Sequence, residues 1–184
     1  MLRLDRMAVM IVDDNRHMLY LISEILRGLN IRTLATLTNA ADAFKEMQIA
    51  AFDLVICDQV MEPISGIEFI YLLRTSKDSP DRFVPVIMVT GSSDVRTVNG
   101  ARDAGVTEFM VKPISARGLY ARILEVINNP RAFIRTKTYF GPDRRRREEP
   151  YDGDERRKMD PDEQNSDGIE VIQAVKPVFW HNNA

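Results

Sequence analysis

The sequence predicts an α/β protein with a parallel sheet of five strands and five helices. Short apolar runs typical of buried strands recur five times, and each is followed by a stretch with apolar residues at helical spacing. Strands that alternate with helices imply a parallel sheet that is covered on both faces. The pattern ends at Asn128, Asn129 and Pro130, where a helix stop is followed by proline.

Each predicted strand is a short run that favours extended structure. The first is continuously apolar, as expected for a strand buried on both faces. In chain order the predicted strands are Met7–Val12, Ile31–Leu37, Leu54–Cys57, Val84–Val89 and Val106–Val111.

The predicted helices lie between and after these strands. Asn15 can cap the first helix, in which apolar residues recur at helical spacing as far as Leu29. Apolar residues from Ile67 to Leu73 mark the third helix. The second, fourth and fifth helices are predicted over Asn39–Ile49, Val95–Ala104 and Ser115–Ile127.

Residues whose side chains could bind a ligand or take part in a reaction directly follow four of the five strands. Asp13 and Asp14 follow the first, Asp58 the third, Thr90 the fourth and Lys112 the fifth. Binding sites in open parallel sheets form at the carboxyl ends of the strands. If the strand order is 2-1-3-4-5, the three carboxylates meet at one edge, where they repel one another unless a cation offsets them. An all-oxygen cluster of this kind suits Mg²⁺.

Taken singly, each of these residues has an ordinary explanation, such as a helix cap or a turn. Their joint placement is harder to obtain by accident. Together with the segments Asp58–Gly66, Thr90–Gly91 and Lys112–Pro113, they resemble the receiver domain of bacterial response regulators in two-component signalling. The resemblance covers residues 5–128. It implies a flavodoxin-like, doubly wound fold with strand order 2-1-3-4-5 and a role as a phosphorylatable switch.

The resemblance also implies roles for individual residues. Asp58 is expected to attack the phosphorus of a phosphohistidine or a small phosphodonor and to become an acyl phosphate. Mg²⁺ is expected to be held by Asp13, Asp14, Asp58 and the backbone carbonyl of Val60. Asp14 is the expected direct ligand, and Asp13 is expected to act partly through water. Lys112 is expected to face the phosphoryl oxygens as a point charge.

The switch residues implied by the resemblance are Thr90 and Phe109. Thr90 is expected to donate its hydroxyl to the phosphoryl group, and its movement is expected to let Phe109 turn inward. The peptide bond before Pro113 is expected to be cis. The sequence departs from the family pattern at Glu62, where the family often has proline, and at Phe109, where it often has tyrosine. Neither change removes an acid or the lysine, so a competent receiver is expected.

Two positions beside the site bear on the lifetime of the acyl phosphate. Val60 and Ser92 flank the expected approach of an attacking water, and neither carries an amide or carboxylate to orient it. Slow self-dephosphorylation is therefore predicted.

Residues 1–129 are predicted to form the receiver domain, and residues 130–184 are expected to form a charged, largely disordered tail. Within the tail, Tyr139–Arg145 and Tyr151–Arg157 share the form Tyr-x-Gly-x-acid-Arg-Arg. One hypothesis is that both copies are short docking motifs for like sites, and the alternative is a solvated, disordered tail. A short strand that pairs with another surface is predicted within Ile169–Val178.

The sequence favours a single-domain response regulator. It is expected to receive its phosphoryl group from a histidine kinase or a histidine phosphotransfer protein and to switch contacts with a downstream protein target. It is not expected to be an enzyme beyond its own phosphorylation and dephosphorylation. One alternative is a transcriptional regulator whose arginine-rich tail binds nucleic acid, although Asp143, Glu148 and Glu149 oppose this. Another is a Mg²⁺-dependent phosphatase, but phosphatases of the haloacid dehalogenase type require a second Asp two residues after the nucleophile, where this chain has Val60.

Charge, cysteine content and the lengths of the apolar segments indicate the cellular location to expect for this protein. The formal net charge of −2 gives no strong overall field toward nucleic acid or membrane. Cys57 is the single cysteine, so no intramolecular disulfide can form. No segment approaches the roughly 20 apolar residues that span a bilayer, and the first residues lack the apolar run of a signal peptide. A cytoplasmic protein without membrane insertion is therefore expected, and a homodimer is compatible with this interpretation.

Overall fold

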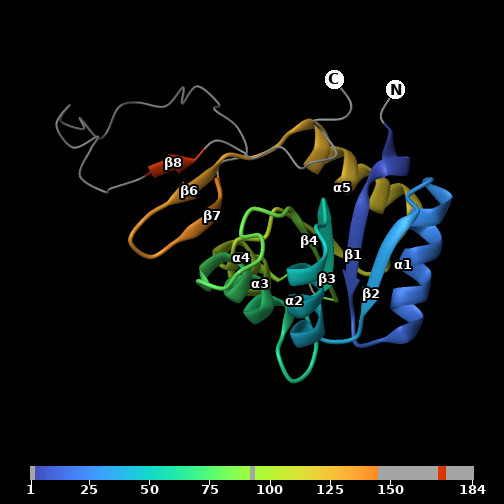
Figure 1. Cartoon of the computed structure of the whole chain (residues 1–184), viewed down its shortest axis with the longest axis horizontal. Coiled ribbons are helices and arrows are strands. Elements are labelled where there is room, and N and C mark those ends of the chain that lie inside the picture. Colours follow the sequence, from blue (N-terminus) through green and yellow to red (C-terminus); the bar gives the residue numbers. More distant parts are fainter. Residues whose placement is uncertain (1–2, 92–93, 145–169, 173–184) are drawn as a thin grey trace.

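The computed structural model describes residues 3–91, 94–144 and 170–172, and it contains the predicted five-stranded parallel sheet (Figure 1). The strands are β1 (Ala8–Val12), β2 (Thr33–Leu37), β3 (Leu54–Asp58), β4 (Val86–Thr90) and β5 (Glu108–Val111). Their order is β2-β1-β3-β4-β5, which confirms the predicted flavodoxin-like topology. β1 and β3 are therefore neighbours, and the switch point of the sheet lies between their carboxyl ends.

The five predicted helices cover both faces of this sheet (Figure 1). A hydrophobic core lies on each face of the sheet, and alternate residues of β1 point into one core or the other. Val9 and Ile11 pack with residues of α1 and α5, whereas Met10 and Val12 pack with residues of α2, α3 and α4. In the described ranges, no helix is long and apolar enough to span a bilayer. The helices are α1 (Arg16–Gly28), α2 (Ala40–Ile49), α3 (Gly66–Thr75), α4 (Val95–Ala104) and α5 (Ala116–Asn128).

Side-chain caps fix where the helices begin. The Asn15 side chain accepts a hydrogen bond from the backbone N–H of His17 at 2.9 Å, as predicted for the start of α1. Ser65 and Glu68 form a capping box at the start of α3, in which each side chain bonds the other residue's backbone N–H. Because these caps directly follow the loops after β1 and β3, they help to hold the polar edge of the sheet in one conformation.

A second, antiparallel sheet follows the receiver-like part of the chain. It contains β6 (Phe133–Arg135), β7 (Phe140–Pro142) and β8 (Glu170–Ile172) in the order β7-β6-β8. The short strand predicted within Ile169–Val178 is present as β8. The rest of that range, residue 169 and residues 173–178, lies outside the described residues.

The hairpin of β6 and β7 departs from the largely irregular structure expected after residue 129. Phe133 and Phe140 pack against Phe83, with ring centroids 5.1 and 5.5 Å from it. The tail is highly charged on average, but these aromatic rings supply apolar surface that becomes buried. The first repeated motif, Tyr139–Arg145, thus docks through its described residues on its own chain, and the second motif, Tyr151–Arg157, lies outside the described residues.

A buried arginine ties the hairpin to the sheet. The Arg74 guanidinium, which is 1% exposed, donates to the carbonyl oxygens of Arg82, Val84 and Gly105. It also lies 5.2 Å from the ring centroid of Phe133. Burial lowers the pKa of Arg74 to about 10, and the three carbonyl oxygens satisfy the charge that burial would otherwise leave without partners.

Candidate functional site

Asp58 and Lys112 meet at the polar edge of the sheet. Asp58 ends β3 and is buried, and Lys112 directly follows β5 and is half-buried. The Lys112 Nζ lies 2.7 Å from Asp58 Oδ1. The backbone N–H of Val60 donates to Asp58 Oδ2 at 3.0 Å. Both carboxylate oxygens thus have a donor, and the carboxylate is held in a fixed orientation.

Asp13 is the second buried carboxylate of the site. Its Oδ1 accepts the backbone N–H of Asn15 at 2.8 Å, and its Oδ2 lies 3.8 Å from Lys112 Nζ. That Oδ2 is buried and has no hydrogen-bond partner among the described residues. Burial is the main cause that raises the pKa of Asp13, and the charges of Asp58 and Asp14 raise it further against the lowering effects of Asn15 and Lys112.

The structure groups two of the three predicted acids with the lysine. Asp14 is exposed, and ion pairs among the described residues link Lys112 to Asp13 and Asp58 only. In the same part of the chain, no three acid, histidine or cysteine side chains converge as a metal site. The donor chemistry nevertheless fits a hard cation, because a buried carboxylate oxygen lacks a donor and the acids outnumber the ammonium.

Thr90 ends β4 and is 2% exposed. Its hydroxyl donates to the side-chain Oε1 of Gln59. Sequence reasoning missed Gln59, because only the β3–β4 register shows that it lies beside Thr90. Gln59 directly follows Asp58, and the pairing of Asp58 with Val89 in the β3–β4 register places it next to Thr90.

The chain after β5 brings Lys112 to the site. Its backbone N–H donates to the carbonyl of Thr90 at 2.8 Å, which continues the β4–β5 pairing by one residue. The Lys112–Pro113 peptide bond is cis, as the resemblance implies, and the Glu62–Pro63 bond is also cis. Phe109 lies in β5, partly buried against the core cluster that includes α2, α3 and α4.

Gly66 lets the loop after β3 fold back on the strand. A Cβ at this position would lie 2.0 Å from the backbone oxygen of Asp58 and 3.1 Å from the Cα of Gln59. The Gly66 N–H also donates to the carbonyl of Gln59 at 2.9 Å. Only glycine fits this approach of backbone to backbone, so Gly66 is needed for the shape of the site.

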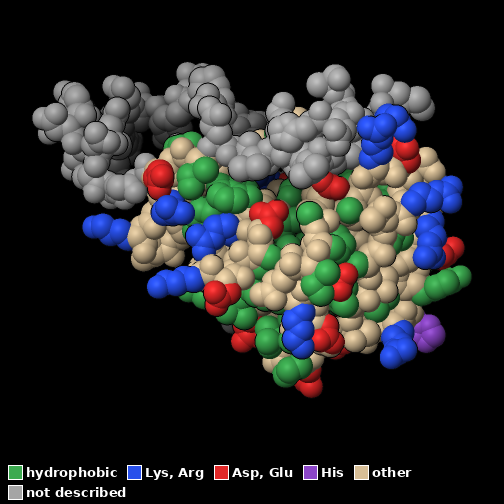
Figure 2. Space-filling model, in the orientation of Figure 1, with side chains coloured by type: hydrophobic (Ala, Val, Ile, Leu, Met, Phe, Trp, Pro, Cys, Tyr) green, Lys and Arg blue, Asp and Glu red, His purple; other side chains and the backbone are tan. Residues whose placement is uncertain are grey.

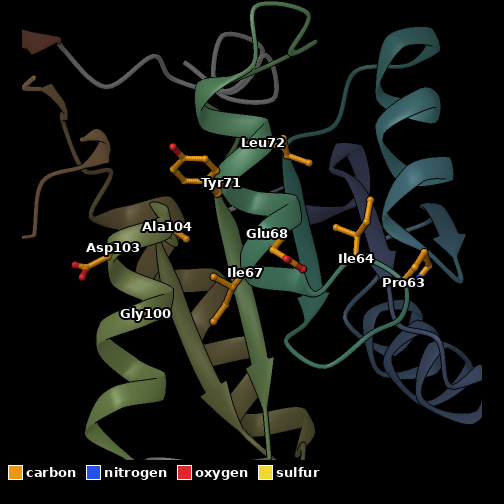
Figure 3. Close-up of a pocket in the computed structure, with 9 residues that line it drawn as sticks. All are labelled: Pro63, Ile64, Ile67, Glu68, Tyr71, Leu72, Gly100, Asp103 and Ala104. Atoms are coloured by element: carbon orange, nitrogen blue, oxygen red, sulfur yellow. The ribbon is translucent and has the colours of Figure 1, made fainter. Parts of the chain in front are cut away.

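A separate apolar pocket of about 550 Å³ opens between α3 and α4 (Figure 3). The side chains of Ile67 and Tyr71 point toward α4 in this view. None of the predicted site residues lines this pocket, so the candidate chemistry lies at the strand ends and not in this cavity. The lining residues are Pro63, Ile64, Ile67, Glu68, Tyr71, Leu72, Gly100, Asp103 and Ala104.

Known proteins match the part of the chain that carries this site. Chemotaxis protein CheY of Pseudomonas aeruginosa is 29% identical over 120 residues, covering 65% of this chain and 95% of that protein. The transcriptional regulatory protein ZraR of Klebsiella oxytoca is 28% identical over 127 residues, which are 69% of this chain but 28% of ZraR. The solved structure of chemotaxis protein CheY4 of Vibrio cholerae superposes with a TM-score of 0.60 at 26% identity, covering 65% of this chain and 98% of that one.

The family described as the response regulator receiver domain matches residues 9–124. This range takes in β1 from Val9 onward, the other four strands of the parallel sheet, and the strand ends where Asp58 and Lys112 meet. The hairpin of β6 and β7 lies beyond the match. Because the match covers more than half of the chain, the chain belongs to the family of response regulator receiver domains.

Proposed function

We propose that this chain is a single-domain response regulator that accepts a phosphoryl group on Asp58 from a histidine kinase or a histidine phosphotransfer protein. The observation that carries the proposal is the ion pair of 2.7 Å between Asp58 Oδ1 and Lys112 Nζ at the carboxyl edge of the sheet. In the reaction, a carboxylate oxygen of Asp58 forms a bond to phosphorus. The bond from phosphorus to the imidazole nitrogen of the donor breaks, and its electron pair stays on that nitrogen.

Mg²⁺ is the proposed cofactor, and Asp13, Asp14, Asp58 and the carbonyl of Val60 would hold it. The buried Asp13 Oδ2 without a donor supports this, since a cation would satisfy it. Asp14 is exposed and would need to turn its carboxylate toward the other two. When bound, the ion offsets negative charge on the transferring group.

Other residues would act on the phosphorylated state. The Lys112 ammonium would move from the Asp58 carboxylate to the new phosphoryl oxygens, because the charge now lies there. The Thr90 hydroxyl would donate to one of these oxygens, and Phe109 would turn inward as Thr90 moves. The resulting change of surface would switch contacts with a downstream protein target. No turnover is proposed beyond the protein's own phosphorylation and dephosphorylation.

The domain division proposed for the chain is a phosphorylatable unit in residues 1–129 and an accessory segment in residues 130–184. Most of the accessory segment, including its arginine-rich stretch from residue 145 on, lies outside the described residues, so the described surface bears only on nucleic-acid binding by the phosphorylatable unit. Figure 2 shows acidic and basic side chains interspersed on the visible face, a pattern unlike the basic stripe of a nucleic-acid binder.

Radiolabelled acetyl phosphate tests the proposed function. With Mg²⁺ present, we expect the chain to take up label that hydroxylamine releases, since hydroxylamine cleaves acyl phosphates but leaves phosphate esters intact. We expect chelation by EDTA to prevent the uptake. Label that resists hydroxylamine, or equal uptake in EDTA, would contradict the proposal.

A further inference from the structure

The position of Gln59 gives it control over Thr90. The Gln59 backbone is fixed on both sides, because its N–H donates to the Val89 carbonyl at 2.8 Å and its carbonyl accepts from Gly66 at 2.9 Å. Its side-chain Oε1 accepts the hydroxyl of Thr90, which is 2% exposed. A rigid backbone therefore presents one acceptor to a hydroxyl that water can hardly reach.

This hydrogen bond competes with the role proposed for Thr90. A threonine hydroxyl has one proton to donate. While that proton lies in the bond to Gln59, it is not available to a phosphoryl oxygen on Asp58. The charged phosphoryl oxygen is the stronger acceptor, but the bond to Gln59 must break before Thr90 can turn to it.

We propose that Gln59 is a positioning residue that sets the resting orientation of the Thr90 hydroxyl and opposes its transfer to the phosphoryl group. The inference rests on the proposed function, which it deepens. A neutral hydrogen bond makes a modest net contribution, so its removal should favour the phosphorylated conformation by roughly threefold to tenfold.

Beryllofluoride, a stable mimic of a phosphoryl group on aspartate, tests this role at equilibrium. We expect Gln59→Met to bind it roughly threefold to tenfold more tightly than the wild type in saturating Mg²⁺. In the Thr90→Val background, which lacks the hydroxyl, we expect the same substitution to change the dissociation constant less than about twofold.

The double-mutant cycle separates this role from a general packing effect. No tightening in Gln59→Met, or an equal gain in the Thr90→Val background, would overturn the role of Gln59. A wild-type protein that binds no beryllofluoride would instead contradict the proposed function itself, so the two failures are distinguishable.

A separate set of contacts joins the hairpin to the end of α4. Arg144 Nη1 lies 3.1 Å from Asp103 Oδ1, and the Arg144 guanidinium lies 4.0 Å from the Tyr139 ring centroid. Gly105 caps α4 with φ at +93°. A Cβ on Gly141 would lie 3.0 Å from the Cα of Gly105, so the two backbones touch.

α4 connects these contacts with the candidate site. The helix begins at Val95, shortly after Thr90, and ends at Ala104, beside the hairpin. We infer that the hairpin senses the phosphorylation state through α4. A shift of α4 that follows movement of Thr90 must either carry the hairpin with it or break the Arg144–Asp103 ion pair. This inference also rests on the proposed function.

Hydrogen exchange on the full chain tests the coupling. With acetyl phosphate and Mg²⁺, we expect the exchange rates of the backbone amides of Phe140, Gly141 and Phe133–Arg135 to change by a factor of about five or more. Arg144→Gln should reduce that change, and β2 serves as the internal control. Equal exchange in the two states, with the adduct verified by mass, would overturn the coupling. Absence of the adduct would count against the proposed function.

Discussion

The Lys112 ammonium lies 2.7 Å from the Asp58 carboxylate, although the two residues stand at the ends of strands that are not neighbours. β4 separates β3 from β5, so the lysine side chain reaches across the end of β4. It neutralises Asp58 more closely than Asp13, whose Oδ2 lies 3.8 Å away. The ammonium therefore pairs mainly with Asp58, the candidate nucleophile. Asp13 is left as the better partner for a metal cation.

Replacement of Lys112 should slow phosphoryl transfer without unfolding the protein. In Lys112→Met, no fixed charge faces the oxygens on which charge develops, so we expect the initial rate of adduct formation to fall on the order of a hundredfold. Intact mass spectrometry of samples quenched at intervals gives the rate. Lys112→Arg keeps the charge with a different geometry and should recover only part of the rate. A Lys112→Met rate within a factor of about three of the wild type would argue against this role.

The raised pKa of Asp13 predicts a pH dependence of stability in metal-free buffer. A carboxyl group whose pKa is higher in the folded protein binds its proton more tightly there than in the unfolded chain. Asp13 therefore destabilises the fold when it is ionised, and that penalty disappears as the pH falls through the raised pKa toward the ordinary aspartate pKa of 3.8.

Asp13→Asn keeps an oxygen for the Asn15 N–H but removes the buried charge. We expect this variant to be more stable than the wild type at neutral pH in EDTA, with the difference shrinking as the pH falls. Urea unfolding across the pH range measures both effects. Added Mg²⁺ should stabilise the wild type selectively. A variant less stable than the wild type at neutral pH in EDTA would contradict the account.

Docking of the hairpin predicts that Phe133 is important for stability. It is 5% exposed and contacts the rings of Phe83 and Phe140, so Phe133→Ala should lower the free energy of unfolding by about 3 kcal/mol. Tyr20, which is 68% exposed on α1, provides an aromatic control, and Tyr20→Ala should change that free energy by less than about 0.5 kcal/mol. Equal effects of the two substitutions in urea unfolding would show that the hairpin is not docked in solution.

The side chain of Val60 bears on the lifetime of the acyl phosphate. It is 69% exposed beside Asp58 and has no polar atom with which to orient a water. We expect Val60→Asn to shorten the half-life of the acyl phosphate roughly tenfold or more. Val171→Asn, at another exposed valine, should leave it unchanged. Ser92, the other residue predicted to matter here, lies outside the described residues. An unchanged half-life in Val60→Asn would show that water access is limited elsewhere.

Periodicity and strand-end residues were enough to predict the receiver-like part of the fold. The apolar strands and the helical spacing repeat regularly, so the order of elements was clear, and the resemblance supplied the strand order. The positions of Asp58 and Lys112 followed, because parallel strands end at one edge. The orientation of Asp14 did not follow, since a solvent-exposed side chain has several rotamers that sequence does not distinguish.

Long-range side-chain contacts account for what the sequence left unpredicted. The hairpin depends on Phe83, which lies far from Phe133 and Phe140 in the chain, and on the buried guanidinium of Arg74. The average composition of the charged tail cannot reveal a cluster that forms with residues elsewhere in the chain. The partner of Gln59 likewise appears only when β3 and β4 are paired in register.

Intact mass spectrometry of the wild type and Asp58→Asn, each incubated with acetyl phosphate and Mg²⁺, tests the phosphoacceptor assignment most directly. The carboxylate of Asp58 is the proposed nucleophile, and an amide in its place cannot form the acyl phosphate. We predict a single phosphoryl adduct on the wild type and none on the variant. An unmodified wild type, or an adduct of equal abundance on the variant, would contradict the assignment.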